Sequence, residues 1–402
     1  MGENIRFEVV KKIAETNFKT RNLADISKLD TASPPSIFIG SGLKYPNVNV
    51  GIMSPLERDK DAWIYDDEKY WADNELEISD VLRLRNSLLN SRFRSKVTDT
   101  RKNKKFVNLA QEIAIGSKPV DVEIELKNRL RFKRDKDRLL TPHGLKAPLK
   151  KAKVVSNVKV NRHLDKAMND EIKAAEAVKT LYKRKFNEYT LNKILSVGVL
   201  GLKKDKRLVP TRWSITATDD MLGKHLLNIV KEFKWIEDFE LHWGEFLGNS
   251  YIILMFPGVW TYELFELYLP NSSWNPTEKI KASTDYEGFH GRKKYAFNTA
   301  GGYYATRLPI LEYLRDIKRQ ASVLVIRIEN PSYWASLGVW VVRESVRKAM
   351  NKKAMRFETR KEMLNSAKKI GDIKYNFDYE QIFQRSKLLK QIKTQTNLNE
   401  FI

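Results

Sequence analysis

The fold class is decided by Phe239-Glu-Leu-His-Trp-Gly-Glu-Phe-Leu-Gly-Asn-Ser-Tyr-Ile-Ile-Leu-Met-Phe256. Aromatic and β-branched runs at Phe239–Trp243 and Tyr251–Phe256 are typical of strands, and Gly248-Asn249 between them predicts a hairpin turn. Trp260–Leu269 continues the same pattern. We therefore expect an antiparallel meander of three strands.

Helices and further strands surround this meander. Apolar residues recur every three or four positions from about Asp165 to Leu195, which predicts an amphipathic helix. Helices are also expected at Ala305–Arg319 and Val339–Phe357, and strands at Lys279–Tyr286 and Val323–Ile328. Strands and helices do not alternate strictly, so the predicted class is α+β (mixed α/β), with several amphipathic helices packed on the strands.

Length and composition exclude several classes of protein. The 402 residues correspond to roughly two or three domains. The absence of cysteine excludes disulfides, thiolate zinc sites and thiol catalysis. No apolar run reaches the ~18–20 residues that cross a bilayer, and residues 1–19 lack a signal-peptide core. We expect a cytoplasmic protein without a membrane partner.

The charge predicts a polyanionic partner. Lys and Arg number 73 against 50 Asp and Glu, a formal net charge of +23. Such a field concentrates nucleic acid near the protein, so DNA is the expected partner and a nucleoid-associated location follows. A surface merely rich in lysine and glutamate, as in thermophiles, accounts for many charges but not for this excess.

Three segments hold most of the excess cations. Lys127–Arg162 carries thirteen Lys or Arg against two Asp, and Pro142, Gly144 and Pro148 prevent one continuous helix. Arg92–Lys105 is a second cluster, and the helix-like stretch Arg343–Lys369 is a third, which is equally consistent with a solvated lysine face. Only Phe132 is aromatic in the longest cluster, so phosphate tracking is expected there rather than base stacking. The candidate DNA-binding residues are Arg129, Arg131, Lys133, Arg134, Arg138, Lys150 and Lys151.

Two segments in the first part of the chain are candidate parts of a pocket. One is rich in glycine and asparagine, and the other is rich in threonine. In the stretch 35–51 a short apolar strand enters a loop in which Asn47 and Asn49 can bind polar ligand edges, although the glycines also fit a plain strand-to-loop junction. In the stretch 207–221, Arg212 is a candidate phosphate ligand. Thr216 or Thr218 is expected to cap a helix whose first turn holds Asp219 and Asp220. The two carboxylates could instead hold Mg²⁺, but no metal ligand is assigned.

Two further segments lie in the second half. Gly301-Gly302 leads into a helix with Tyr303 and Arg307, a combination of free amides and a guanidinium that suits an anion. His290 lies between glycines and near acids, where it could titrate near neutrality or simply be structural. In the fourth segment, Glu344 is a candidate catalytic carboxylate and Arg343 a phosphate ligand, while an ion pair of Arg343 or Arg347 with Glu344 is the default. No cofactor motif is present.

The C-terminal residues form the sharpest motif. Leu398, Phe401 and Ile402 fall at positions i, i+3 and i+4, so one helical turn presents all three, and Gln395 lies one turn earlier. This pattern resembles the sliding-clamp-binding box, Gln-x-x-aliphatic-x-x-aromatic-aromatic, with Ile402 in place of the second aromatic residue. The expected partner is a sliding clamp.

The chain also resembles the archaeal Nre family of DNA-repair proteins. The matching strings are Tyr45–Gly51, Leu208–Thr216 with Asp219-Asp220, Gly301–Arg307, and Gly338–Trp340 with Arg343-Glu344. The cysteine-rich stretch that begins many members is absent here. The resemblance implies an Nre N-terminal-like region at 36–285 that includes the basic segment 127–162, and an Nre C-terminal-like region at 286–389. An arm at 1–35 and a flexible clamp-binding tail at 390–402 complete the expected organisation.

Two functions of different class remain open at this point. In the first, the chain is a DNA-binding protein of the DNA-damage response, recruited to the sliding clamp. In the second, the four segments form one pocket of an enzyme that acts on DNA or a nucleotide-derived adduct, as a nuclease or an ADP-ribose-handling enzyme does. Asp219, Asp220, Glu344 and His290 are the candidate catalytic residues of that pocket. Convergence of their side chains favours the enzyme, and burial in separate helices favours the binding protein.

Overall fold

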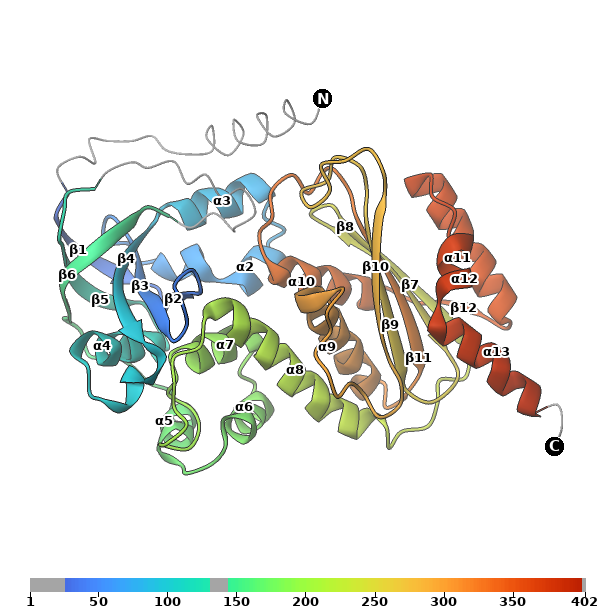
Figure 1. Ribbon diagram of the computed structural model, residues 1–402, viewed down its shortest axis with the longest axis horizontal. Coiled ribbons are helices and arrows are strands. Elements are labelled where there is room, and N and C mark those ends of the chain that lie inside the picture. Colours follow the sequence, from blue (N-terminus) through green and yellow to red (C-terminus); the bar gives the residue numbers. More distant parts are fainter. Residues whose placement is uncertain (1–25, 131–143, 400–402) are drawn as a thin grey trace. The chain divides into compact units, whose positions relative to one another are not determined.

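The computed structural model describes residues 26–130 and 144–399. This described chain divides into two compact units that meet in sequence at Leu222 and Gly223. Each unit is built around one six-stranded mixed sheet (Figure 1). The predicted α+β class is confirmed. Within the described residues, no helix combines the length and apolar character needed to cross a membrane.

The N-terminal unit contains the sheet β1–β6. Its strand order is β1-β5-β6-β4-β3-β2, antiparallel except for a short parallel contact between β4 and β6. The strands are β1 Lys28–Ser33, β2 Ile37–Gly40, β3 Asn47–Pro55, β4 Leu88–Lys96, β5 Val120–Leu126 and β6 Lys146–Val154. Residues 28–33, expected in an appended arm, therefore form an edge strand paired with β5.

Short helices accompany this sheet. They are η2 Ala62–Asp66, α2 Glu68–Asp73, α3 Ile78–Asn86, η3 Val97–Arg101, α4 Lys105–Ala114, α5 Arg162–Asn169, α6 Ala174–Lys183 and α7 Glu188–Ser196. The prediction of a single helix over Asp165–Leu195 is wrong, because the chain leaves the helix at Asp170 and again at Lys185, whose φ is +65°. Asn187 then begins α7 by accepting a hydrogen bond from the amide of Thr190.

The C-terminal unit contains the second sheet, in the order β10-β9-β11-β8-β7-β12. Its elements are α8 Thr211–Val230, which begins in the N-terminal unit, β7 Phe239–Phe246, β8 Asn249–Phe256, β9 Thr261–Tyr268, β10 Lys281–Glu287, α9 Ala300–Asp316, β11 Ser322–Glu329, α10 Val339–Met350, β12 Met355–Phe357, α11 Arg360–Tyr375, α12 Glu380–Arg385 and α13 Lys387–Asn399. The predicted β7–β8 hairpin is present, with Leu247 and Gly248 both at positive φ.

The third strand of the expected meander has a different neighbour. β11 lies between β8 and β9, antiparallel to β8 and parallel to β9. All its residues are buried, which suits a central strand covered on both faces. The helix expected over Val339–Phe357 ends at Met350, because the last three residues pair with β7 as strand β12. For the same reason Arg343–Lys369 is not one helix.

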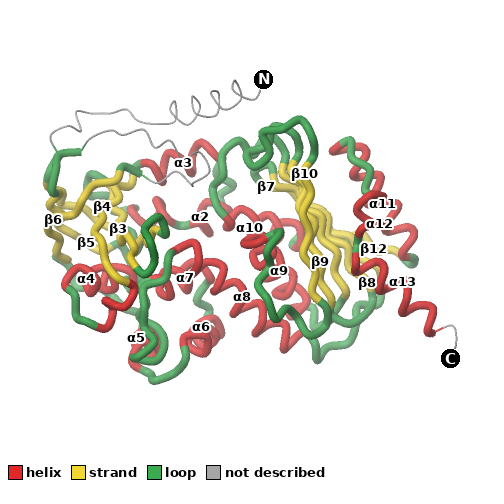
Figure 2. The backbone as a smooth tube through the Cα atoms, viewed as in Figure 1, coloured by secondary structure: helices red, strands yellow, loops and turns green. Residues whose placement is uncertain are grey.

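Helices cover both faces of this second sheet. Figure 2 shows α9 and α10 on one face and α11, α12 and α13 on the other. Strand β9 alternates accordingly: Glu266 lies against Gly302 of α9, whereas Phe265 and Leu267 join the core beneath α11–α13. That core also contains Met363 and Leu388. The unit is therefore a three-layer arrangement of helices, sheet and helices.

One buried carboxylate holds the start of α13. Glu263 of β9 is 1% exposed and accepts hydrogen bonds from the hydroxyl of Ser386 (2.6 Å), the amide of Lys387 (3.1 Å) and the amide of Leu388 (3.0 Å). An anion at a helix N-terminus is favourable because the amides there have no intrahelical partner. The C-terminal helix is thus anchored to the sheet at its first turn.

Glu263→Gln should loosen this anchor. The amide keeps one acceptor oxygen but loses the charge, at a cost of about 1–2 kcal/mol. Hydrogen exchange of the amides of α13 should accelerate roughly 10-fold, as measured by mass spectrometry on peptides from this helix. The matched control is Glu358→Gln, an exposed carboxylate. Equal acceleration in both variants contradicts the anchoring role.

Candidate nucleic-acid interface

The β3–β4 ladder brings two predicted sets of residues onto one face. Its register places Asn47 opposite Lys96, Asn49 opposite Arg94, and Gly51 opposite Arg92. Residues directly opposite in an antiparallel pair point to the same side of the sheet. The three cations are exposed, whereas Val48, Val50 and Ile52 on the other side are buried. The basic cluster Arg92–Lys105 therefore begins as a row of cations on the outward face of a strand.

An exposed aromatic pair lies at the end of this row. The rings of Tyr45 and Trp213 are 5.9 Å apart, and the side chains are 51% and 50% exposed. Tyr45 precedes Pro46, whose carbonyl accepts a hydrogen bond from the amide of Val97, directly after Lys96. The exposed Arg212 is adjacent to Trp213 in the chain. Large exposed aromatic rings beside cations are suited to stack on bases while the cations contact phosphates.

We call this surface the Tyr45–Trp213 patch. Its members are Tyr45, Asn47, Arg92, Arg94, Lys96, Arg212 and Trp213. A hydrogen bond from the amide of Ile39 to the hydroxyl of Thr211 (2.9 Å) ties β2 to the first residue of α8. The structure thus brings together the first two of the four predicted segments, 35–51 and 207–221.

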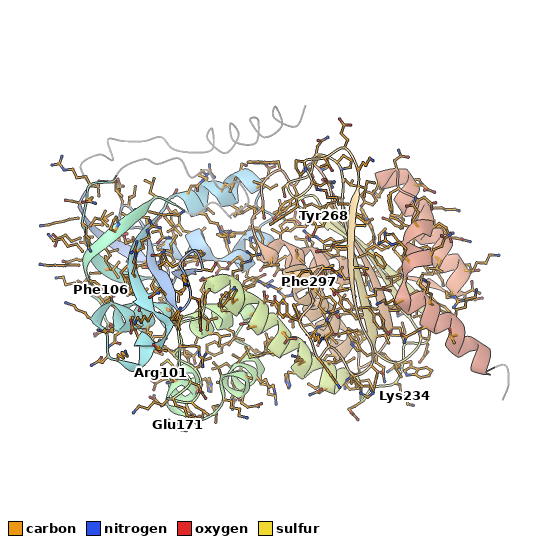
Figure 3. The ribbon with its side chains drawn as sticks, viewed as in Figure 1. Arg101, Phe106, Glu171, Lys234, Tyr268 and Phe297 are labelled. Atoms are coloured by element: carbon orange, nitrogen blue, oxygen red, sulfur yellow. The ribbon has the colours of Figure 1, made fainter. Side chains whose placement is uncertain are left out.

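Local packing explains why the ladder presents this face. On the opposite face the ring of Phe93 lies 5.3 Å from the ring of Phe106 in α4. Phe106 is labelled in Figure 3. A Cβ on Gly51 would come within 1.9 Å of the side-chain oxygen of Asn90. Gly51 is therefore required for the close approach of β3 and β4.

The cations of the two basic clusters differ in their pairing. Among the described residues, no carboxylate forms an ion pair with Arg92, Arg94 or Lys96. On β6, Lys150 pairs with Glu125 at 2.6 Å and Lys153 pairs with Glu123 at 3.0 Å. Lys150 and, less strongly, Lys151 lower the pKa of the Glu125 carboxyl. The acidic residues of β5 thus offset part of the charge of the Lys127–Arg162 cluster.

Of the other five predicted DNA-binding residues in the Lys127–Arg162 cluster, one lies in the described chain and four do not. Arg129 is exposed and lies at the end of the described stretch. Arg131, Lys133, Arg134 and Arg138 lie outside the described residues.

The start of α8 corrects one prediction. The helix begins at Thr211, directly after Pro210, and neither Thr216 nor Thr218 caps it. Asp219 and Asp220 consequently lie inside the helix, with Asp219 1% exposed. A carboxylate pair opening a helix is not formed, because Pro210 starts the helix two turns earlier than expected. Nowhere in the described chain do three or more Asp, Glu or His side chains gather as metal ligands.

Asp285 holds the residues that lead into α9, where the sequence predicts an anion site. Asp285 of β10 accepts hydrogen bonds from the amides of Asn298 (2.9 Å) and Thr299 (2.8 Å). Arg292 pairs with the same carboxylate at 3.1 Å. Gly301 and Gly302 open the helix, and a Cβ on Gly302 would come within 2.3 Å of Glu266. Gly302 therefore serves close packing on the sheet.

Arg307 is an internal ion-pair partner. It is 1% exposed and donates to Glu287 at 2.8 Å, and the indole of Trp260 donates to the same carboxylate at 3.1 Å. The guanidinium carbon lies 5.8 Å and 5.2 Å from the ring centres of Tyr303 and Tyr304. Burial, reinforced by Glu287, raises the pKa of the Tyr303 hydroxyl. These residues bind one another in the interior.

The fourth segment packs in the same manner. Glu344 accepts from Arg347 at 2.7 Å, and Arg347 also pairs with Glu312 of α9 at 3.1 Å. The default ion pair of the sequence analysis is therefore confirmed for Arg347. Arg343 is buried at 2% exposure, whereas His290 is exposed with its ring against Phe289. The ion pair of Arg347 with Glu312 thus joins α10 to α9.

The predicted clamp-binding residues lie at the end of the C-terminal unit. Gln395 and Leu398 fall within α13, whose backbone is helical through Asn399, so they are three positions, or just under one turn, apart along the helix. Phe401 and Ile402 lie outside the described residues. In Figure 1, α13 runs past the edge of its sheet toward the C-terminus.

Sequence reasoning missed part of the patch. Tyr45 and Trp213 were noted only within longer strings, and Arg92, Arg94 and Lys96 only within a charge cluster. Arg92, Arg94 and Lys96 are spaced two residues apart, which places all three on one face of a strand, and this spacing could have identified them. The meeting of Tyr45 with Trp213 depends on tertiary structure.

Comparison with known proteins matches the chain to two family models. The model described as Archaeal Nre, N-terminal, matches residues 3–275, and the model described as Archaeal Nre, C-terminal, matches residues 287–401. The chain is 42% identical to DNA repair protein NreA of Haloferax volcanii over 321 residues, 78% of this chain and 76% of the relative. It is 39% identical to DNA repair protein NreA of Archaeoglobus fulgidus over 342 residues, 85% of each chain. It is 35% identical to DNA repair protein NreB of the same organism over 366 residues, 91% of this chain and 90% of the relative. No solved structure matches the chain.

Proposed function

This chain belongs to the archaeal Nre family, and on that premise we propose that it is a DNA-binding protein of the DNA-damage response, recruited to the sliding clamp by its C-terminal motif. The printed names of its relatives, DNA repair proteins NreA and NreB, support the repair role. The observation that carries DNA binding is the Tyr45–Trp213 patch. It joins an exposed row of cations to two exposed aromatic rings.

The geometry favours a binding protein over an enzyme in the C-terminal unit. Arg307 and Glu344, which the enzyme hypothesis needs in a pocket, are engaged in internal ion pairs. The two segments of the N-terminal unit form an open surface rather than a buried set of reactive groups. Open surfaces of cations and aromatic rings hold nucleic acid without chemistry.

The clamp motif is supported by the anchoring of α13. Glu263 fixes the first turn of the helix that carries Gln395 and Leu398. A short apolar motif on a terminal helix is a recurrent way for one protein to fill a groove on another. DNA contact and clamp contact then belong to different units of the chain, so they can be separated by mutation.

The double substitution Arg92→Ala and Arg94→Ala tests DNA binding. Duplex affinity should fall about 10-fold or more near 0.1 M salt, and the slope of log K against log salt should become shallower by roughly 1.8, since each lost phosphate contact removes about 0.9. The measurement is fluorescence anisotropy of a labelled duplex at several salt concentrations, with the full chain.

Lys150→Ala with Lys153→Ala is the matched control. It removes the same charge from a neighbouring strand, but these cations already pair with Glu125 and Glu123. Affinity and slope should change little. An equal loss in both variants shows that only net charge matters, and an unchanged Arg92/Arg94 variant rejects the patch.

A further inference from the structure

A second surface of the N-terminal unit is hollow. A cavity of about 710 Å³ opens among the Pro34-Pro35 turn, η2, the end of α4, the start of α5 and the loop between α6 and α7. Volumes of about 300–1,000 Å³ are typical of small-molecule and cofactor sites. None of its lining residues belongs to the Tyr45–Trp213 patch, so it is a separate feature.

The rim of the cavity is cationic. Lys60, Lys118, Arg184 and Lys185 line it and are exposed, and among the described residues none of the four forms an ion pair. The acid Asp67 at the rim is engaged as the N-cap of α2, where it accepts from the amide of Tyr70. Four cations around one opening favour an anionic group at the mouth.

The walls are apolar and partly aromatic. Trp63 is 37% exposed, and its ring stands edge-on to that of Tyr70 at 5.0 Å, which orients the indole. Phe186 contributes further apolar surface, and the buried side chains of Leu164 and Ile194 lie behind it. A flat ring can therefore enter between the cations and find an aromatic side chain to contact.

The lining also contains an ion pair with low exposure. The ammonium of Lys193 lies 2.8 Å from the Asp66 carboxylate and also donates to the Asp66 carbonyl at 2.8 Å. Although burial alone would raise the pKa of Asp66 and lower that of Lys193, their mutual attraction lowers the first and raises the second. Both groups are therefore charged near neutrality. The pair places a charged donor and a charged acceptor side by side in the cavity wall, where both can meet the polar edge of a ligand.

From these four features we infer that the cavity binds one nucleotide of unpaired DNA. The phosphate lies at the rim cations, the base lies against Trp63, and the polar edge of the base meets the donor and acceptor of the Lys193–Asp66 pair. An unpaired base has a free face to stack and free edges to bind, whereas a base within a duplex has neither. This inference rests on the proposed DNA-binding function and adds a preference for single strands.

The test compares a 20-nucleotide oligo-dT with a 20-base-pair duplex, using the full chain and anisotropy. Wild type should bind the single strand more tightly. Lys118→Glu with Arg184→Glu should weaken single-strand binding at least 10-fold and change duplex binding less than about 3-fold. Trp63→Ala should reproduce the single-strand loss, and Trp63→Phe should restore most of it, because phenylalanine still offers a ring face.

Two controls separate this inference from the proposed function. Lys203→Glu with Lys204→Glu makes the same charge change at exposed lysines outside the cavity and should leave the single-strand preference intact. Arg92→Ala with Arg94→Ala should weaken both ligands together. If the patch variant loses binding but the cavity variants do not, the cavity inference fails and the proposed function stands. If wild type binds neither ligand, both fail.

Photo-crosslinking gives an independent readout. An oligo-dT that carries 4-thiothymidine should crosslink to peptides that contain Trp63 or Phe186, and excess duplex should compete poorly. An acidic peptide, poly-Glu, is the rival occupant of a cationic rim. Displacement of the oligonucleotide by poly-Glu at equal charge concentration, or crosslinks only outside the cavity, overturns the assignment.

Discussion

Replacing Arg307 with alanine is expected to lower the free energy of unfolding by about 3–5 kcal/mol, because it leaves the buried Glu287 carboxylate without its cationic partner. The ion pair is 2.8 Å long, and the two side chains are 1% and 0% exposed. The substitution also removes the guanidinium beside the rings of Tyr303 and Tyr304. The measurement is urea denaturation of the full chain, followed by tryptophan fluorescence and by circular dichroism.

Two further variants identify the cause of that loss. Arg212→Ala, at an exposed position, should change stability by less than about 0.5 kcal/mol. The double variant Arg307→Met with Glu287→Gln should recover a large part of the loss, since it removes both charges and keeps much of the volume. If Arg307→Ala is as stable as Arg212→Ala, Arg307 is not the structural residue described here.

Deleting residues 395–402 should abolish clamp binding and leave DNA affinity within about 2-fold of wild type. The deletion removes the apolar residues of the motif, each of which contributes about 1.5–3 kcal/mol when fully buried in a groove. It lies in the C-terminal unit, whereas the Tyr45–Trp213 patch lies in the N-terminal unit. Calorimetry with an archaeal sliding clamp and anisotropy with duplex DNA measure the two activities.

Point variants make the deletion specific. Phe401→Ala should weaken the clamp complex by roughly 10-fold or more, and Ile402→Phe, which restores the second aromatic residue of the motif, should strengthen it. Lys393→Ala, outside the motif residues, is the control and should have a small effect. Clamp binding that survives the deletion contradicts recruitment through this tail.

The spacing of apolar residues along the chain predicted the helices and strands that are buried over most of their length. The β7–β8 hairpin, β11 and α9 were expected within a few residues of their observed bounds, because their sequences satisfy strand or helix packing without outside help. The N-terminal sheet was largely missed. Its strand β6 reads as a charge cluster in the sequence, although Ala147, Leu149 and Ala152 between the cations are buried and the strand pairs with both β5 and β4.

The helical spacing of apolar residues also gave a wrong prediction where it continued across the ends of separate helices. Helices α5, α6 and α7 each keep the apolar spacing of a helix, so the sum resembles one long helix. The positive φ of Lys185 interrupts it, and no pattern of apolar residues records a backbone angle.

The amino-acid sequence by itself determined the excess of positive charge, the α+β class, the family membership and the terminal apolar motif, because these depend on residue type and spacing along the chain. Only the tertiary structure decided which charged groups face water and which face each other. Arg307 and Arg94 are the same residue type, yet one meets Glu287 in the interior and the other lies exposed on β4. The two arginines differ because a buried charge loses its hydration and is stable only beside an opposite charge. That opposite charge comes from another part of the chain, which only the tertiary structure brings close.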